Sequence, residues 1–350
     1  MGIEIRNIAK NEKGELIAFH RRNYRAGHIL EDPRYLDWQF GEFPRRSDSY
    51  SILGAWSAGR LLGVFGYTET PYLCFGKRCR AVSLGHLMVE PSVRHLGIGA
   101  LLLARVKKSF ALAIDHGLTR DAVRLFTEMG FKGETLSRFA RVLSPDAVAK
   151  AVGAELPVTK AELPKSDFRF VRLRSYDPRL ALLMRSVREK YPITVERSKR
   201  YLEWRYFHHP LISYALFAAE RRGRLHSFVA VRIEGPDECR AGRIIDCISE
   251  ESAEAFTLLS VAAFCRDAGA HYVDYYFSGP LQKRALRNAG FADAGSGLLS
   301  LLPSRLNPPV FGGSNAIDFV VQARRGMLRR ASHPRSWYTT KGGGDQDRAY

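Results

Sequence analysis

Apolar residues in the first 145 positions follow the period of strands in some segments and the period of helices in others. Short apolar or alternating runs predict strands, and segments with apolar residues every three or four positions predict helices. The predicted strands cover residues 3–8, 50–56, 61–68, 80–89, 111–115 and 138–143. The predicted helices cover residues 11–24, 32–40, 97–110 and 119–129. This order predicts an α/β (α+β mixed) unit, in which helices flank a mostly antiparallel twisted sheet.

The same pattern restarts in the second half of the chain. The sequence YLDWQF at residues 35–40 returns as YLEWRY at residues 201–206, and Gly130-Phe131 returns as Gly290-Phe291. Four short matches occur in the same order at offsets of 160 to 166 residues. The sequence therefore predicts a tandem duplication of one unit. The first unit spans residues 1–145 and the second 167–305, with a linker at 146–166 and a C-terminal extension at 306–350.

The C-terminal extension has its own pattern. Residues 315–330 predict a helix, and residues 336–340 predict a strand before a glycine run at 342–344. An exposed tail is the usual state of such a segment. Because Trp337 and Tyr338 are large and aromatic, we expect part of the extension to dock between the two units.

The duplicated aromatic pairs Tyr35/Trp38 and Tyr201/Trp204 have helical three-residue spacing. Core packing against the sheet is the favoured interpretation, because both units keep the pair.

One strand–turn–helix connection carries readable chemistry. The predicted strand 80–89 is followed by a turn that holds Gly97 and Gly99, and then by a helix with Leu102, Val106 and Phe110 on one face. The first turn of a helix presents free backbone N–H groups and the positive end of the helix dipole. Glycine lets an anion approach the backbone, and Arg94 adds a positive charge. The connection therefore predicts a pyrophosphate-binding site.

The pattern Val89-x-Pro91-x-x-Arg94-x-x-Gly97-x-Gly99 resembles motif A of the GNAT superfamily, the acyl-CoA N-acyltransferases. The element order of residues 1–145 is similar to that of the family as well. The resemblance implies that the cofactor is acetyl-CoA or another acyl-CoA. It also implies that the following residues hold its pyrophosphate: Arg94, His95, Leu96, Gly97, Ile98, Gly99 and Ala100. The preceding strand residues Leu87, Met88 and Val89 are implied to hold its pantetheine.

The second unit departs from this pattern. Its equivalent strand, 243–248, leads into Ser249-Glu250-Glu251-Ser252-Ala253-Glu254 and lacks Arg-x-x-Gly-x-Gly. Three carboxylates at the start of a helix satisfy the helix dipole and repel phosphates. We therefore expect this GNAT-like unit to have lost CoA binding, so that the chain binds one CoA and the second unit shapes the acceptor pocket.

Transfer of an acyl group to an amine needs a base and often an acid. The resemblance implies a tyrosine acid five residues before Phe131, but that position is Phe126. His86 is one candidate base, although strict alternation puts it on the strand face opposite Leu87, unless a bulge intervenes. A buried structural histidine is the alternative for His86. Asp115 and His116, at the end of a predicted strand, are equal candidates.

The net charge of +18 suits nucleic acid, an anionic membrane surface or a nucleotide ligand, although the arginines are spread along the chain. The five cysteines show no paired spacing, which favours reduced thiols in the cytoplasm over a zinc site or disulfides. No apolar run is long enough to cross a membrane.

Together these features favour an acyl-CoA-dependent N-acetyltransferase that acts on a small-molecule amine or an amino sugar. Two alternatives stay open: a Fem-like transferase that uses aminoacyl-tRNA, and a non-catalytic acyl-CoA-binding protein. Nucleic acid as a partner is not excluded, and the sequence leaves the oligomeric state open.

Overall fold

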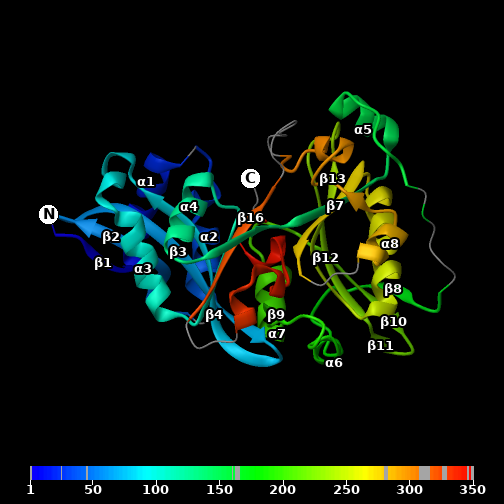
Figure 1. Ribbon diagram of the computed structural model, residues 1–350, viewed down its shortest axis with the longest axis horizontal. Coiled ribbons are helices and arrows are strands. Elements are labelled where there is room, and N and C mark those ends of the chain that lie inside the picture. The colour runs from blue at the N-terminus through cyan, green and yellow to red at the C-terminus, as the bar shows by residue number, and fades with distance from the viewer. Residues whose placement is uncertain are drawn as a thin grey trace.

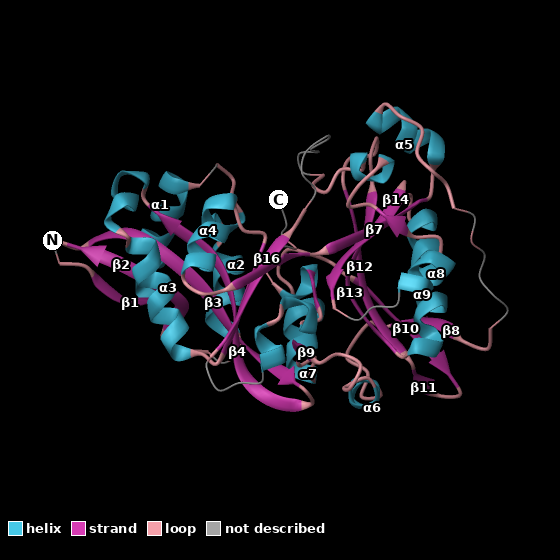
Figure 2. Ribbon diagram, in the orientation of Figure 1, coloured by secondary structure: helices cyan, strands magenta, loops and turns pink. Residues whose placement is uncertain are grey.

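The computed structural model describes residues 2–24, 26–44, 46–159, 161, 166–279, 283–306, 316–324, 329–344 and 347. Across these residues the strands form two twisted sheets that lie next to each other, and helices flank both (Figures 1 and 2). The predicted fold class, two tandem α/β units with mostly antiparallel sheets, is confirmed.

The first sheet has one parallel strand pair among antiparallel ones. Its order is β1 (Glu4–Ala9), β2 (Ser49–Ser57), β3 (Arg60–Cys74), β4 (Lys77–Val89), β5 (Leu112–His116), β16 (Asp318–Ala323) and β6 (Lys132–Thr135), and β9 (Ile193–Val195) pairs with β3. The parallel pair is β4 with β5. The helices of this half are α1 (Lys13–Asn23), α2 (Pro33–Leu36), α3 (Ile98–Ser109) and α4 (Arg120–Glu128).

The second sheet repeats this plan. Its order is β11 (Arg224–Leu225), β10 (Ala215–Arg221), β12 (Ser227–Glu234), β13 (Ala241–Ser249), β14 (Tyr272–Ser278), β7 (Ser137–Val142) and β15 (Ala292–Asp293). Two further strands join it: β8 (Arg169–Arg172) pairs with β10, and β17 (Thr339–Thr340) pairs with β14. Its parallel pair, β13 with β14, occupies the place of β4 and β5. The helices are α5 (Pro145–Val152), α6 (Leu180–Ser186), α7 (Lys199–Leu202), α8 (Glu251–Asp267) and α9 (Lys283–Asn288).

The two halves exchange strands. The prediction that residues 138–143 complete the first unit is wrong in its placement, because β7 lies in the second sheet between β14 and β15. The prediction of a helix over 315–330 is wrong for residues 318–323, which form β16 between β5 and β6 of the first sheet (Figure 1). Residues 315 and 325–328 lie outside the described residues. Both errors arise because these strands pair with segments that are distant in the sequence. The positions of the domain boundaries stay a prediction.

Trp38 and Trp204, equivalent residues of the two repeats, pack against each other rather than against separate sheets. Their rings stack at 4.8 Å with 19° between the planes. The Nε1 group of Trp38 donates to the carbonyl of Trp204 at 2.9 Å, and Trp204 Nε1 donates to the carbonyl of Trp38 at 3.0 Å. Reciprocal contacts between equivalent residues are the mark of a two-fold interface. The halves therefore face each other across an approximate two-fold axis.

The expectation that the C-terminal extension docks is confirmed. Trp337 and Tyr338 are fully buried, and the predicted strand over 336–340 is limited to Thr339–Thr340, which pairs with β14. Trp337 contacts Tyr72 of β3, with ring centroids 5.6 Å apart, while Tyr338 donates a hydrogen bond to the carbonyl of Cys247 in β13. The extension therefore lies between the two sheets and contacts both.

The five cysteines are all free thiols. In the part of the chain that the structure describes, no helix is long and apolar enough to span a membrane, and no group of three or more His, Cys, Asp or Glu side chains is arranged to hold a metal ion.

Candidate functional site

The turn between β4 and α3 has the backbone that its glycine predicts. After Val89 the chain forms a short 3-10 turn, Pro91–Leu96, and Gly97 then adopts φ 69°, ψ 17°, the left-handed region that favours glycine. A Cβ at Gly97 would meet no atom within 4 Å, so the need for glycine here is conformational and not steric. The left-handed residue ends the turn and starts α3 at Ile98. The first amides of α3 consequently face outward with no carbonyl partner inside the helix.

The electrostatics of this turn favour an anion. Arg94 is exposed, and its Nε donates to the carbonyl of Val89 at 3.1 Å, which holds the guanidinium beside the turn. The carboxylate of Glu90 is ion-paired with Arg60. The first turn of α3 carries no acidic residue. The turn therefore has net positive charge next to the positive end of the helix dipole, and both favour a bound anion.

The structure brings the predicted pyrophosphate residues together on this one turn. His95 and Leu96 are exposed beside Arg94, whereas the Ile98 side chain is buried. Gly99 has ordinary van der Waals space around it, because a Cβ there would lie 3.6 Å from Leu125.

The strands β4 and β5 separate next to this turn. Their pairing runs from Ala81 with Leu112 to Leu84 with Asp115, and in the described ladder it stops there. β4 continues to Val89, so its main chain from 85 to 89 faces a gap on the β5 side. The predicted pantetheine residues Leu87, Met88 and Val89 lie on this segment. An exposed strand edge can pair with an extended ligand that carries amide groups.

A β-bulge re-aims His86. The pairing of β3 with β4 shifts register between Val64 and Gly66, and His86 lies in the bulged segment at φ 59°. Period-two alternation therefore fails at this point of the strand, because a bulge turns the side chains that follow it. His86 lines a cavity of about 390 Å³, its open mouth included. Strict alternation therefore fails between Ser83 and His86, which line the same cavity. His86 still lies opposite Leu87, because His86 contacts Phe40 whereas Leu87 packs in the core cluster of α3.

Both halves and the C-terminal extension wall this cavity. The lining residues are Gln39, Phe40, Tyr67, Thr68, Thr70, Ser83, Leu84, Gly85, His86, Tyr201, Trp204, Arg205 and Gly342–Gly344. Side chains of both halves hold the glycine run. Ser83 Oγ donates to the carbonyl of Gly343 at 3.2 Å, while Tyr201 Oη and Arg205 Nε donate to that of Gly342 at 3.2 and 3.1 Å. Burial raises the pKa of Tyr201 to about 12, so the phenol keeps its proton for this bond at neutral pH.

The structure does not bring Asp115 and His116 together with His86. Both lie buried at the end of β5, and neither lines the cavity. His116 Nε2 lies 2.7 Å from Thr339 Oγ1, and a Cβ on Gly344 would come within 2.5 Å of His116 Nδ1. Asp115 Oδ1 accepts a hydrogen bond from the His116 amide at 2.8 Å. The C-terminal extension therefore covers these two residues.

Phe126, at the position where the resemblance implies a tyrosine acid, is a core residue. It is fully buried, and its ring makes edge contacts with Phe65 and Phe131. Part of the cavity wall has no signal in the sequence. Tyr201 belongs to the repeat and the glycine run to the C-terminal extension, and no local pattern marks Arg205.

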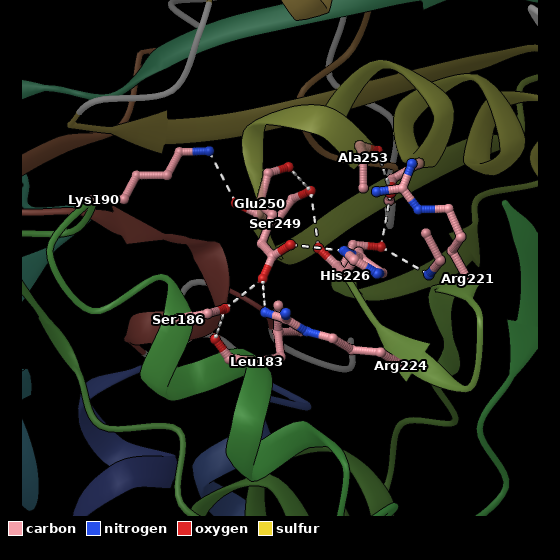
Figure 3. Close-up of polar contacts among 12 residues, drawn as sticks. Leu183, Ser186, Lys190, Arg221, Arg224, His226, Ser249, Glu250 and Ala253 are labelled. Atoms are coloured by element: carbon pink, nitrogen blue, oxygen red, sulfur yellow. Dashed lines mark hydrogen bonds and ion pairs between the residues drawn. The ribbon is translucent and has the colours of Figure 1, made fainter. Parts of the chain in front are cut away.

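The second half places the carboxylate of Glu250 at the helix start that corresponds to the turn before α3 (Figure 3). Glu250 is the N-cap residue of α8, but its side chain does not bond the helix amides; Ser186 Oγ donates to it at 2.6 Å, and His226 Nδ1 lies 2.7 Å away. Arg224 forms an ion pair with the same carboxylate. Burial opposes ionisation of Glu250, but Ser186, His226 and Arg224 together hold its pKa below the usual range. The helix N-terminus is therefore occupied by a charge of the chain itself.

The separated strands of the second half are filled as well. Pairing of β13 with β14 stops at Ile244 with Tyr275, the same arrangement as in β4 and β5. Here Tyr338 donates to the carbonyl of Cys247, while Lys190 Nζ donates to that of Ser249 at 2.9 Å. Side chains thus bind this strand edge at Cys247 and Ser249, and in β4 Arg94 binds the carbonyl of Val89 in a similar way. This geometry agrees with the expectation that the second half has lost CoA binding.

No protein-family profile matches the sequence, and no curated protein sequence is significantly similar to it. Solved structures are similar in fold. A GCN5-related N-acetyltransferase from Anabaena variabilis superposes with a TM-score of 0.61 at 9% identity, over 92% of this chain and 73% of that one. A similar enzyme from Kribbella flavida gives 0.58 at 13% identity, over 92% and 71%.

The likeness extends to a second group. Saccharomyces cerevisiae N-myristoyltransferase, solved with bound myristoyl-CoA and inhibitors, superposes with a TM-score of 0.57 at 12% identity, over 98% of this chain and 86% of that one. The chain therefore has the two-unit α/β fold of the GCN5-related N-acetyltransferases and N-myristoyltransferases, as its resemblance to the GNAT superfamily predicted.

Proposed function

We propose that this protein is an acyl-CoA-dependent N-acyltransferase that uses one acyl-CoA per chain. The observation that carries the proposal is that three features of the first half follow one another along the chain and in space. An anion-binding helix start, Gly97 to Ala100, leads to the open edge of β4, and that edge leads to the cavity at His86. Bound acyl-CoA would supply the thioester. The fold neighbours are N-acyltransferases by name, which supports the general reaction.

The acyl group is acetyl in this proposal. The acyl group and the acceptor amine have to share one small cavity walled by both halves and the C-terminal extension, which favours a short acyl chain over a myristoyl chain. Hydroxyl, amide and aromatic side chains line it, including Gln39, Thr68 and Tyr67. These groups suit a small-molecule amine or an amino sugar, because hydroxyls and amides are the partners of hydroxylated ligands. The free cysteines support a reducing, cytoplasmic setting.

His86 is the proposed general base. It lines the cavity at the end of the open strand edge, whereas Asp115 and His116 lie under the C-terminal extension. The acceptor enters as an ammonium, and the imidazole removes a proton to free the lone pair that attacks the thioester carbonyl. The C–S bond then breaks, the second amine proton is lost as the amide forms, and the CoA thiolate takes a proton from the imidazolium to leave as the free thiol. A main-chain amide of residues 85–89 would donate to the oxyanion that forms.

Calorimetry with acetyl-CoA tests the donor site. Arg94→Glu and Gly97→Glu each place a carboxylate at the anion site, so each should weaken binding by about tenfold or more. Arg172→Glu, an exposed charge reversal on β8, is the matched control and should leave the affinity unchanged. If the unaltered protein binds no acyl-CoA, the proposal fails. Steeply salt-dependent binding of tRNA would then favour the aminoacyl-tRNA alternative.

Release of free thiol from acetyl-CoA, measured across a panel of amines, tests catalysis. His86→Asn keeps a residue that tolerates positive φ and removes the imidazole. We expect its kcat to fall by about 10²- to 10⁴-fold while acetyl-CoA affinity stays unchanged. The acid limb of the pH profile should disappear with it. Binding of acetyl-CoA without transfer to any amine would favour the non-catalytic alternative.

A further inference from the structure

A second cavity lies in the other half of the molecule. It is enclosed by α6, the segment 187–191, β9, the start of α7 and the end of β13, and its volume is about 810 Å³ with its mouth included. It is lined by Leu73, Tyr176, Ala181, Met184, Arg185, Val187, Arg188, Tyr191, Thr194, Val195, Glu196, Arg197, Ser198, Lys199 and Ile248. It shares no lining residue with the cavity at His86.

The interior of this cavity is apolar. Val187, Val195, Leu73 and Ile248 are buried hydrophobic residues of the main core cluster or its edge, and Met184 is partly buried beside them. Aliphatic side chains and one thioether suit a flexible hydrocarbon, since dispersion contacts with such chains need no fixed geometry.

The mouth of the cavity carries positive charge. Arg185, Arg188 and Lys199 are exposed lining residues. The carboxylate of Glu196 also lines the cavity, but it is held 2.5 Å from Arg78 of β4. Lys199 lies 3.8 Å from the half-buried carboxylate of Glu203. Two arginines and a partly neutralised lysine thus face an entering ligand.

The one buried charge of the lining is already neutralised. Arg197 forms a two-point ion pair with Asp246, at 2.7 and 2.9 Å. A ligand therefore meets an apolar interior and a cationic rim, and the interior itself offers no uncompensated charge.

We propose that this cavity binds a single-chain amphipathic anion: an aliphatic tail that enters the interior and an anionic head that pairs with Arg185 and Arg188. Burying the tail gains about 0.8 kcal/mol per CH₂ group. An exposed arginine at the rim adds only a modest attraction, so the tail supplies most of the affinity. The rim arginines determine that the head group is an anion and not a cation. The site lies behind Tyr191 and Ile248 of the filled second half, and it does not depend on the proposed acyl transfer.

Calorimetry of the full-length protein with dodecanoate, below its micelle concentration, tests the site. Dodecyltrimethylammonium has the same tail and a cationic head, and it serves as the charge-reversed probe. We expect saturable binding of one dodecanoate per chain and no binding of the cationic probe. The double variant R185E/R188E should weaken dodecanoate binding by about tenfold. Arg172→Glu, outside the cavity, should leave it unchanged.

Ala181→Trp tests the location, because Ala181 is a partly buried lining residue of α6 and an indole there would fill the interior. It should abolish dodecanoate binding while the thermal unfolding temperature stays near that of the unaltered protein. Lack of dodecanoate binding, or binding that Ala181→Trp leaves intact, would overturn the proposal. If CoA competed with dodecanoate for binding, dodecanoate would occupy the first half, and this result would also overturn the proposal. Binding to phosphatidylglycerol vesicles without binding to free dodecanoate would assign the rim to a membrane surface instead.

Discussion

Replacing Asp246 by asparagine should destabilise the fold far more than a typical surface change does. Asp246 lies in β13 with 1% of its surface exposed, and Arg197 is 5% exposed. The carboxylate accepts hydrogen bonds from Arg197 Nε and Nη2 and, at 2.8 Å, from Tyr206 Oη. The asparagine keeps the volume and removes the charge, so the buried guanidinium loses its counter-ion.

The expected loss follows from that geometry. Breaking a buried ion pair by removal of one partner costs about 3–5 kcal/mol, because an uncompensated charge stays in the interior. Domains of ordinary size have only about 5–15 kcal/mol of stability, so the variant should unfold at a much lower urea concentration. The assay is urea unfolding at neutral pH, followed by fluorescence and by circular dichroism. Coincident curves would justify a two-state free energy.

Two further variants make the test decisive. R197M/D246L replaces the pair by apolar groups and should be more stable than Asp246→Asn alone, although Tyr206 and Thr194 then lose a partner at about 1 kcal/mol each. Glu128→Gln breaks the ion pair with Arg124, in which the Glu128 side chain is 61% exposed and the Arg124 side chain 82% exposed. It should have no measurable effect on the free energy of unfolding. If Asp246→Asn lost less than about 1 kcal/mol, the charge would not be desolvated and the reasoning would be refuted.

Three further outcomes are expected. Gly97→Ala should cost about 1 kcal/mol and weaken acetyl-CoA binding, while Gly97→Asn should be closer to the unaltered protein in calorimetry and thermal unfolding, because asparagine tolerates the left-handed region. Burial lowers the pKa of His209 to about 2, with Arg205 and Arg232 adding to the effect. The native state then excludes a proton that the unfolded chain binds below about pH 6.5. Urea unfolding should therefore show stability falling by up to about 1.4 kcal/mol per pH unit below that point, with a smaller slope in His209→Asn. Trp38→Phe and Trp204→Phe each remove one reciprocal hydrogen bond and should cost about 1 kcal/mol, and equal losses in urea unfolding would support the two-fold relation of the halves.

Local chemistry was readable from the sequence. The turn at Gly97 was predicted because glycines between a strand and a helix let an anion approach the backbone, and the structure places Gly97 at φ 69°, a conformation that favours glycine. Carboxylates were predicted to satisfy the N-terminus of α8, and Glu250 is its N-cap residue, although its carboxylate bonds Ser186, His226 and Arg224 and makes no capping bond to the helix. The repeat at Tyr35 and Tyr201 was visible because duplication leaves residues in order, and the two sheets share one plan.

The candidate catalytic residues were less readable. Alternation along β4 separates Ser83 from His86, yet the two line one cavity, because a bulge depends on the partner strand β3 and leaves no local signature. Asp115 and His116 look accessible at the end of a strand, yet Thr339 and Gly344 from the distant C-terminal extension cover them. The access of a side chain to solvent depends on segments hundreds of residues away.

The sequence by itself determined most of the elements, the duplication and the glycine turn before α3, since each depends on neighbouring residues or on their period. Only the tertiary structure decided the exchange of β7 and β16, the reciprocal stacking of Trp38 and Trp204, and the closing of the second half by Tyr338. The physical reason is that backbone conformation follows local sterics and capping, whereas strand partners are chosen by burial and hydrogen bonding across the whole chain. Long-range contacts of this kind, from Tyr338 and Lys190, fill the strand edge of the second half.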